Sequence, residues 1–320
     1  MRSLSVSTLA TLSILAACGG QDPGSQTPDP MAQDTTFHPP ALKEGMTRIE
    51  LPPIPNIEPG QEAMWCQWVR APLDRDIDVL EATGAQGVGG HHAILYATTS
   101  NAPLGTTRAC TDEDLTTVRY LGAIGGEGAT TDNAALPEGL VYRIPAGLAL
   151  MANVHYVNYT QQPITGEGVL DMRFAEKDPA KRVATLFTNI DVEVDLAPKA
   201  RASLDVNCTL QQDFQMFWFG NHMHSYGASA FTEVIRADGT QVMLRKDDRW
   251  EAEAKFNPSF TRWPVENPLI LRRGDRMHTH CEWNNTADHN VSFPSEMCVG
   301  FGFHIGDGVQ IDCIKGEWTH

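Results

Sequence analysis

Two closely spaced histidine pairs give the chain its strongest chemical signal, which is metal binding. His222 and His224 are separated by one residue in GNHMHSYG. Alternate side chains of a β-strand point to the same face, so both imidazoles can reach one metal ion. His91 and His92 are adjacent in GGHHAILY, and a regular strand would point them to opposite faces. The preceding glycines permit a bulge that turns both rings toward one ion; they are Gly87, Gly89 and Gly90.

Three more histidines lie on predicted strands. His155 is surrounded by apolar residues in ALMANVHYV, and a buried imidazole there needs a partner. His278 and His280 in RMHTHCEW form another pair at alternate positions, which could be rival ligands, an accessory metal site or simply part of a half-exposed strand. Taken one at a time, each of these histidines could also be an ordinary packed or half-exposed residue.

Strands, not helices, must position these side chains. Segments such as 139–159, 183–196, 214–219 and 231–244 are short, rich in β-branched and aromatic residues, and separated by Gly, Pro, Asn and Asp. Asp238 and Gly239 predict a hairpin turn. Only residues 112–121 could carry a few turns of helix. The pattern predicts an all-β protein made of antiparallel β-sandwiches.

The length of 320 residues allows two domains, each with its own core. The polar stretch 175–182 is the best candidate boundary. We therefore predict two tandem, jelly-roll-like sandwich domains, an N-terminal one over 46–178 and a C-terminal one over 179–320.

The N-terminus has the sequence pattern of an export signal. Residues 1–18 have one basic residue, Arg2, and then an apolar stretch too short to span a membrane. The stretch ends in Leu-Ala-Ala-Cys, which resembles the lipobox of bacterial lipoproteins and makes Cys18 the expected lipidation site. Residues 19–45 have the composition of a flexible tether. We expect an exported, lipid-anchored protein at the outer membrane, facing the periplasm or the cell surface.

Charge and cysteine content narrow the partners and the compartment. A net charge of -16 would repel phosphate backbones, so nucleic acid is not an expected partner. Membrane contact is expected through the lipid anchor alone, and the sequence does not indicate an oligomeric state. Without Cys18, six of the seven cysteines remain, and in an oxidising compartment these predict three disulfides whose pairing the spacing leaves open.

Four motifs in order resemble the copper type II, ascorbate-dependent monooxygenases, the family of peptidylglycine α-hydroxylating monooxygenase and dopamine β-monooxygenase. They are GGHHAILY, ANVHYVN, GNHMHSYG and SEMC. Their order along the chain is also similar to the family pattern. Four matches in order are more specific than any single one.

The resemblance implies two copper ions per chain, one in each domain. His91, His92 and His155 would hold the electron-donating copper. His222, His224 and Met297 would hold the catalytic copper, at which dioxygen reacts. A thioether beside two imidazoles suits Cu(I), whereas hydrolytic zinc sites more usually use a carboxylate or a third histidine. The resemblance also implies the disulfide pairs, which are Cys66 with Cys110, Cys208 with Cys313, and Cys281 with Cys298.

The implied activity is hydroxylation of an activated C–H bond in a small organic or peptide-like substrate, with dioxygen and a one-electron reductant such as ascorbate. Departures from the peptide-amidating branch affect the expected substrate pocket. Gly220 replaces its arginine, Val299 its asparagine and Phe301 its tyrosine, so the pocket should be more apolar. Asn153 and Tyr156 are candidate residues for orienting the imidazoles. The alternative is a copper-binding or electron-relay lipoprotein without catalysis.

Overall fold

The computed structural model describes residues 36–320 except 101, 116–117, 127–134, 256–257, 294 and 320. The expected signal sequence, Cys18 and the first part of the expected tether lie outside the described residues. Residues 36–45 have no regular secondary structure, and they contact the body of the protein through Pro40, whose carbonyl accepts a hydrogen bond from Arg48 at 2.7 Å. Among the described residues, no helix has the length and apolar character needed to cross a membrane.

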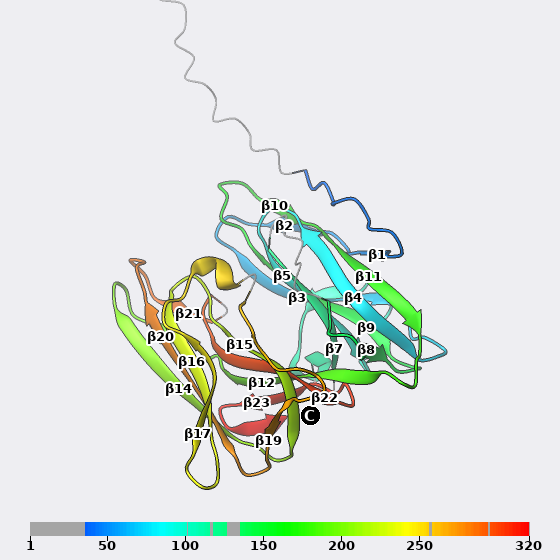
Figure 1. Ribbon diagram of the computed structural model, residues 1–320. Helices are drawn as coiled ribbons and strands as arrows, with labels where there is room; N and C mark the ends of the chain where they lie inside the picture. Colours follow the sequence, from blue (N-terminus) through cyan, green and yellow to red (C-terminus); the bar gives the residue numbers. More distant parts are fainter. Residues whose placement is uncertain are drawn as a thin grey trace, which may run out of the picture. The chain divides into compact units, whose positions relative to one another are not determined.

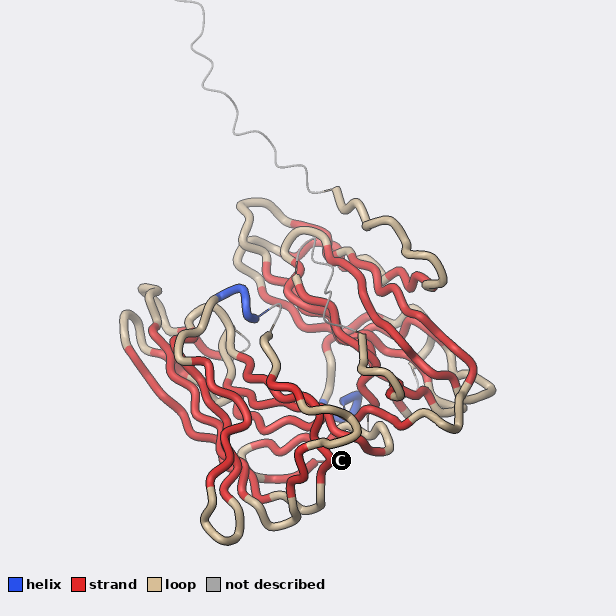
Figure 2. The backbone as a smooth tube through the Cα atoms, viewed as in Figure 1, coloured by secondary structure: helices blue, strands red, loops and turns tan. Residues whose placement is uncertain are grey.

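The described part of the protein is all-β, as the sequence pattern predicts. Strands make up most of the backbone in Figure 2. Up to residue 176 they are β1 (Thr47–Glu50), β2 (Ile54–Ile57), β3 (Glu62–Arg70), β4 (Ile77–Gln86), β5 (Gly90–Thr98), β6 (Thr107–Ala109), β7 (Arg119–Gly125), β8 (Leu140–Ile144), β9 (Ala149–Val157), β10 (Ile164–Gly166) and β11 (Gly168–Glu176). The later strands are β12 (Arg182–Asp191), β13 (Asp195–Leu196), β14 (Arg201–Thr209), β15 (Phe214–His222), β16 (Gly227–Ile235), β17 (Gln241–Asp247), β18 (Thr261–Arg262), β19 (Leu269–Leu271), β20 (Arg276–Asn284), β21 (Val291–Ser292), β22 (Cys298–Gly306), β23 (Ile311–Ile314) and β24 (Glu317–Thr319).

Three sheets carry most of the structure (Figure 1). A five-stranded sheet has the order β6-β3-β9-β5-β7, and a four-stranded sheet has the order β14-β20-β16-β17. The largest sheet runs β1-β11-β4-β8-β12-β22-β15-β18, with β19, β23 and β24 attached. A short parallel pairing of β8 with β12, through Arg182↔Leu140 and Val183↔Val141, joins its two parts.

The apolar residues of these sheets form separate cores. One core includes Leu95, Leu150 and Leu170, and it continues onto Trp218 and Phe303 of the later strands. A second core includes Phe187, Phe214 and other residues between the later sheets. Residues 35–320 form one compact unit. The boundary at 178/179 stays a prediction.

Local expectations differ from the structure mainly for helices. Of the described residues in the segment 112–121, Asp112–Leu115 form a single 3₁₀ turn, η1, and the residues from Arg119 onward pair as β7 with β5. A second turn, η2 (Ala252–Lys255), was not expected. The hairpin predicted at Asp238 and Gly239 joins β16 and β17, and Gly239 has a φ of 84°.

The three disulfides are those that the family resemblance implies. They join Cys66 to Cys110, Cys208 to Cys313, and Cys281 to Cys298. The third one ties β20 to the first residue of β22, immediately after Met297.

Candidate metal centre

A bulge at the start of β5 brings His91 and His92 to the same side of the strand. Gly90 pairs with Tyr156 and His92 pairs with His155 on β9, so His91 is the extra residue between the two pairs. Gly89 has a φ of 77°, a left-handed conformation that favours glycine. The bulge that the glycines predict is therefore present.

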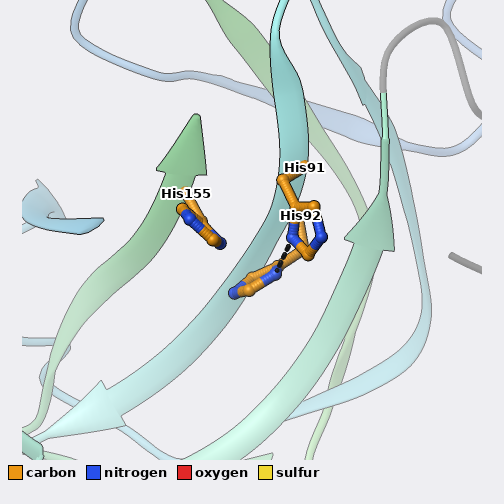
Figure 3. A group of neighbouring side chains, drawn as sticks. All are labelled: His91, His92 and His155. Carbon is orange, nitrogen blue, oxygen red and sulfur yellow. Dashed lines mark hydrogen bonds between the residues drawn. The ribbon is translucent and has the colours of Figure 1, made fainter. Parts of the chain in front are cut away.

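Three imidazoles converge beside this bulge (Figure 3). The Nδ1 atoms of His91 and His92 are 2.9 Å apart, and candidate ligand atoms of these two residues and His155 all lie within 4.8 Å of one another. His91 and His155 are buried, whereas His92 is half-buried. The ring centroids of His91 and His155 are 4.6 Å apart. The geometry thus supplies three nitrogen donors for one ion.

Glu62 at the start of β3 orients the ring of His155. The Nε2–H of His155 donates to the Glu62 carboxylate, with a distance of 2.8 Å to Oε1. The other carboxylate oxygen accepts a hydrogen bond of 2.6 Å from the hydroxyl of Ser295. Burial opposes ionisation of Glu62, but the hydrogen bonds from His155 and Ser295 lower its pKa. The Nδ1 atom of His155 is buried without a hydrogen-bond partner, which leaves its lone pair available for a metal.

His222 and His224 lie at the end of β15 and in the turn that follows. Their ring centroids are 5.1 Å apart. His222 is the last residue of β15 and pairs with Val299, while His224 is buried. The Nε2 atom of His224 is buried without a hydrogen-bond partner, like Nδ1 of His155.

Hydrogen bonds fix the backbone of His224 on both sides. Its N–H donates to the carboxylate of Glu296 at 3.0 Å, and its carbonyl accepts a 2.8 Å hydrogen bond from the indole N–H of Trp250. Glu296 also accepts hydrogen bonds from the backbone N–H of Tyr226 at 2.7 Å and the indole N–H of Trp283 at 3.0 Å. Burial raises the pKa of Glu296, and these donors partly offset that rise.

The register of β15 and β22 places the remaining predicted residues near His222. Met297 immediately precedes β22, whose first residues lie beside the end of β15. Phe301 faces His222 with ring centroids 6.5 Å apart, and Gly220 pairs with Phe301. A Cβ atom on Gly220 would lie 3.2 Å from the carbonyl oxygen of Ser259 and 3.3 Å from the ring of Phe260, so the backbone here leaves little room for a side chain.

The two histidine sets adjoin each other. The ring centroids of His91 and His224 are 4.6 Å apart. The hydrogen-bonded chain from His155 through Glu62 to Ser295 is a second link, since Ser295 lies two residues before Met297. The five imidazoles are therefore one contiguous group.

Burial favours the neutral form of four of these imidazoles, which are those of His91, His92, His222 and His224. It lowers the pKa of His222 to about 3, with a further contribution from His224. It lowers the pKa of His224 to about 4, helped by the nearby His155. Burial also lowers the pKa values of His91 and His92. Neutral imidazoles are the form that binds metal ions.

The donor set fits copper. Imidazole nitrogens with buried lone pairs suit copper, and a thioether ligand such as Met297 would favour Cu(I). The unpartnered nitrogens of His155 and His224 are the observation that carries this fit, because a buried nitrogen without a partner is costly unless something else occupies it.

His278 and His280 lie on a different surface. On β20, the side chain of Thr279 points between the sheets, where its hydroxyl accepts a 3.0 Å hydrogen bond from Asn189. His278 and His280 therefore point to the outer face of the four-stranded sheet. On β15, the side chain of Asn221 points between the sheets and accepts a hydrogen bond from Thr232. The side chain of His222, one residue later, therefore lies on the opposite face of the sheet that contains β15. The two pairs diverge, and the rival-ligand interpretation of His278 and His280 is wrong.

Two positioning residues were missed by sequence reasoning. The expected orienting residues, Asn153 and Tyr156, have other roles, since the Asn153 amide donates to the sulfur of Cys110 at 3.0 Å and Tyr156 is packed in the first core. Glu62 and Glu296 hold the site instead. Glu296 had a usable signal, because a carboxylate between Ser295 and the apolar run after Met297 must be paired if it is buried. Nothing in the sequence marks Glu62.

Comparison with known families finds one match in the later part of the chain. Residues 183–313 match the model of the C-terminal domain of copper type II ascorbate-dependent monooxygenases. A comparison with curated proteins finds no match.

Comparison with solved structures finds remote similarities. The major capsid protein P2 of bacteriophage PM2 matches 82% of this chain and 99% of its own, with 9% identity and a TM-score of 0.33. PNGase F, a glycosylasparaginase from Flavobacterium meningosepticum, matches 83% of this chain and 97% of its own, with 9% identity and a TM-score of 0.38. At these TM-scores, neither similarity bears on function.

Proposed function

We propose that this protein is a copper monooxygenase that hydroxylates an activated C–H bond of a small organic or peptide-like substrate, because residues 183–313 match the model of the C-terminal domain of copper type II ascorbate-dependent monooxygenases. The observation that carries the proposal is the contiguous group of five imidazoles, with buried lone pairs on His155 and His224. Two ligand sets of different composition favour catalysis over simple metal carriage.

The protein's own groups hold the proposed copper ligands in place. His91, His92 and His155 would bind one ion, and His222, His224 and Met297 a second. When bound, copper would supply one-electron redox chemistry with dioxygen and a reductant such as ascorbate. The Glu62 carboxylate fixes the proton of His155 on Nε2 and so keeps Nδ1 free for the ion.

The surroundings of His222 suit a neutral, apolar substrate. Phe301 faces the His222 ring, and the ring of Phe260 lies 5.4 Å from that of Phe301. Gly220 itself has no charged group to bind a substrate carboxylate, and the close approach of Ser259 and Phe260 leaves little room for a larger side chain at that position. We therefore assign Gly220, Val299 and Phe301 to the substrate pocket and favour substrates that carry an aromatic or other apolar group beside the reacting carbon.

The setting of the activity completes the proposal. We propose that the protein acts outside the cytoplasm as a lipid-anchored protein of the outer membrane, attached through Cys18. The three disulfides support an oxidising compartment.

Oxygen uptake by the copper-loaded protein tests the proposed activity. We expect ascorbate-dependent oxygen consumption that a neutral aromatic compound with a benzylic C–H bond stimulates, together with a hydroxylated product in the mass spectrum. Met297→Ala should abolish product formation.

Two results would contradict the proposal. Bound copper that ascorbate reduces, without product from any compound in an aliphatic, aromatic and peptide panel, would favour the relay or carrier alternative. Preference for glycine-extended peptides over neutral aromatic compounds would overturn the assignment of the pocket.

A further inference from the structure

Ser295 lies between β21 and β22, where the later strands meet the start of β3. Its hydroxyl donates a 2.6 Å hydrogen bond to Oε2 of Glu62, the first residue of β3. Its own N–H donates to the carbonyl of Ser292 at 2.8 Å, which holds the turn. The side chain of Glu62 is only 17% exposed, so the hydroxyl replaces water that this carboxylate has lost.

The hydroxyl of Ser295 supports the first histidine set, which is His91, His92 and His155. The other oxygen of Glu62, Oε1, accepts the Nε2–H of His155 at 2.8 Å. A carboxylate that is hydrogen-bonded at both oxygens cannot rotate without breaking one of these bonds, so the hydroxyl fixes the direction from which the His155 ring is held. Ser295 therefore acts on a ligand of the first set.

The backbone of Ser295 supports the second set, which is His222, His224 and Met297. Burial lowers the pKa of His224 to about 4, and a hydrogen bond between its ring and the backbone of Ser295 partly opposes this effect. A hydrogen bond that raises the pKa of an imidazole is one that the ring donates, so the acceptor is the Ser295 carbonyl. Because Nε2 of His224 is buried without a hydrogen-bond partner, the donor is Nδ1.

Each set thus contains one imidazole with the same asymmetry. His155 and His224 each have one ring nitrogen that is hydrogen-bonded and one that is buried without a partner. Both hydrogen bonds lead to Ser295, through Glu62 in one case and directly in the other. Met297 follows Ser295 by two residues, so one residue is linked to a proposed ligand of the first set and to two of the second.

We propose that Ser295 is a positioning residue for both copper sites, with its hydroxyl directing His155 through Glu62 and its carbonyl directing His224. This role rests on the proposed copper binding and goes beyond it, because Ser295 itself binds no copper. Since both links pass through one turn, displacement of that turn should change the two sites together. Ser295 is exposed, so its side chain can be altered without opening a core.

The copper affinity of each set tests this role. Competition with a chelator under ascorbate measures Cu(I) binding to the first set in a Met297→Ala background and to the second in a His155→Ala background. Ser295→Ala should lower the affinity of the first set about tenfold and that of the second about threefold. Ser295→Thr keeps the hydroxyl and the carbonyl and should restore both affinities. Ser292→Ala, at an exposed position on the same turn, is the matched control and should change neither.

An unchanged affinity at either set in Ser295→Ala would overturn the proposal, as would an equal loss in Ser292→Ala. A stability measurement on metal-free protein separates the link itself from copper binding. In a Glu62→Ala background, Ser295→Ala should cause no further loss of stability in urea, because the partner of the hydroxyl is already absent. A further loss as large as in the unmodified protein would contradict the link to Glu62.

Imidazole NMR spectra of metal-free protein provide a readout that depends on neither copper nor activity. Proton–nitrogen correlations should show the proton of His155 on Nε2 and that of His224 on Nδ1. A proton on Nε2 of His224 would overturn the role of the Ser295 carbonyl. Absence of hydroxylated product, with the expected spectra and the expected copper affinities, would count against the proposed function alone.

Discussion

The His155 imidazole lies between a carboxylate on one ring nitrogen and a buried, unpartnered nitrogen on the other. This asymmetry gives the ring a defined tautomer. His224 is held differently, because Glu296 and Trp250 bind its backbone while its Nε2 stays unpartnered. For His155 the hydrogen bond to the ring decides which nitrogen can bind a metal, whereas for His224 the hydrogen bonds with Glu296 and Trp250 fix the position of the backbone that carries the ring.

Glu62→Gln should weaken copper binding at His91, His92 and His155. A glutamine amide cannot fix the His155 proton as a carboxylate does, and loss of such a partner typically lowers metal affinity by about tenfold to a hundredfold. Competition with a copper chelator measures the affinity. The exposed Glu58→Gln is the matched control, and equal affinity in both variants would show that Glu62 does not position the ligand.

Glu296→Gln should destabilise the turn that carries His224. The Glu296 carboxylate accepts hydrogen bonds from two backbone N–H groups and one indole N–H. A glutamine would turn its NH2 group toward one of these N–H groups, which would then lose its acceptor. We expect a loss of about 2 kcal/mol in the free energy of unfolding, measured by urea denaturation. Glu266→Gln, at an exposed position, should change it little. A stable Glu296→Gln protein with unchanged affinity for copper would contradict this role.

The bulge at the start of β5 is the local structure that makes the first histidine set possible. A regular strand would have separated His91 from His92, and the backbone of Gly89 provides the turn that precedes the bulge. A Cβ atom on Gly89 would lie 2.8 Å from the carbonyl oxygen of Val157 and 2.6 Å from Ile164. The element therefore depends on glycine for both its φ angle and its close packing.

Gly89→Ala tests this dependence against Gly60→Ala. Gly60 has a φ of 75°, close to that of Gly89, but a Cβ atom on Gly60 would meet nothing within 4 Å. Gly60→Ala should cost about 1 kcal/mol of stability from its backbone conformation alone. Gly89→Ala should cost about 2 kcal/mol more from the steric conflict, and it should also lower copper affinity. Thermal or urea unfolding compares the two, and equal losses would refute the packing argument.

The 3₁₀ turn η1 is held by an ion pair between the exposed Arg108 and the buried Asp114, which should make stability depend on pH. Hydrogen bonds from Arg108, one of them 2.8 Å long, hold the pKa of Asp114 below its ordinary value against the effect of burial. A lowered carboxyl pKa gives stability that is complete above the ordinary pKa and is lost as the pH falls below about 4.

Asp114→Asn should therefore lower stability near pH 7 by about 1 to 2 kcal/mol and flatten its decline in acid. Urea unfolding between pH 2 and pH 7 measures both effects. Asp74→Asn, at an exposed position, should keep the slope of the unmodified protein. An unchanged acid slope in Asp114→Asn would exclude this ion pair as its source.

Across the whole chain, the sequence was informative wherever a pattern was local. Short runs rich in β-branched and aromatic residues predicted the strands, and the glycines before His91 predicted the bulge. The resemblance implied the three disulfide pairs. Contacts between distant residues could not be predicted in this way. The approach of His91 to His224, the reach of Glu62 to His155 and the pairing of β7 with β5 depend on strands that are remote in sequence.

The shared core explains why the two histidine sets meet. Apolar residues of the early strands, such as Leu95 and Leu150, pack in one core with Trp218 and Phe303 of the later strands. The ring of Phe303 lies 5.4 Å from that of Tyr120. These contacts join the strands that carry the first histidine set to those that carry the second, so metal binding at one set should be sensitive to the other.

Copper content is the most direct test of the two-site account. The full chain should be loaded with Cu(I) under ascorbate and freed of excess copper on a desalting column. We predict two copper ions per chain, falling to one with His155→Ala and to one with Met297→Ala, each from a different set. One copper ion or none per chain without the His155 and Met297 substitutions would contradict the account. A copper content that neither substitution changes would contradict it as well.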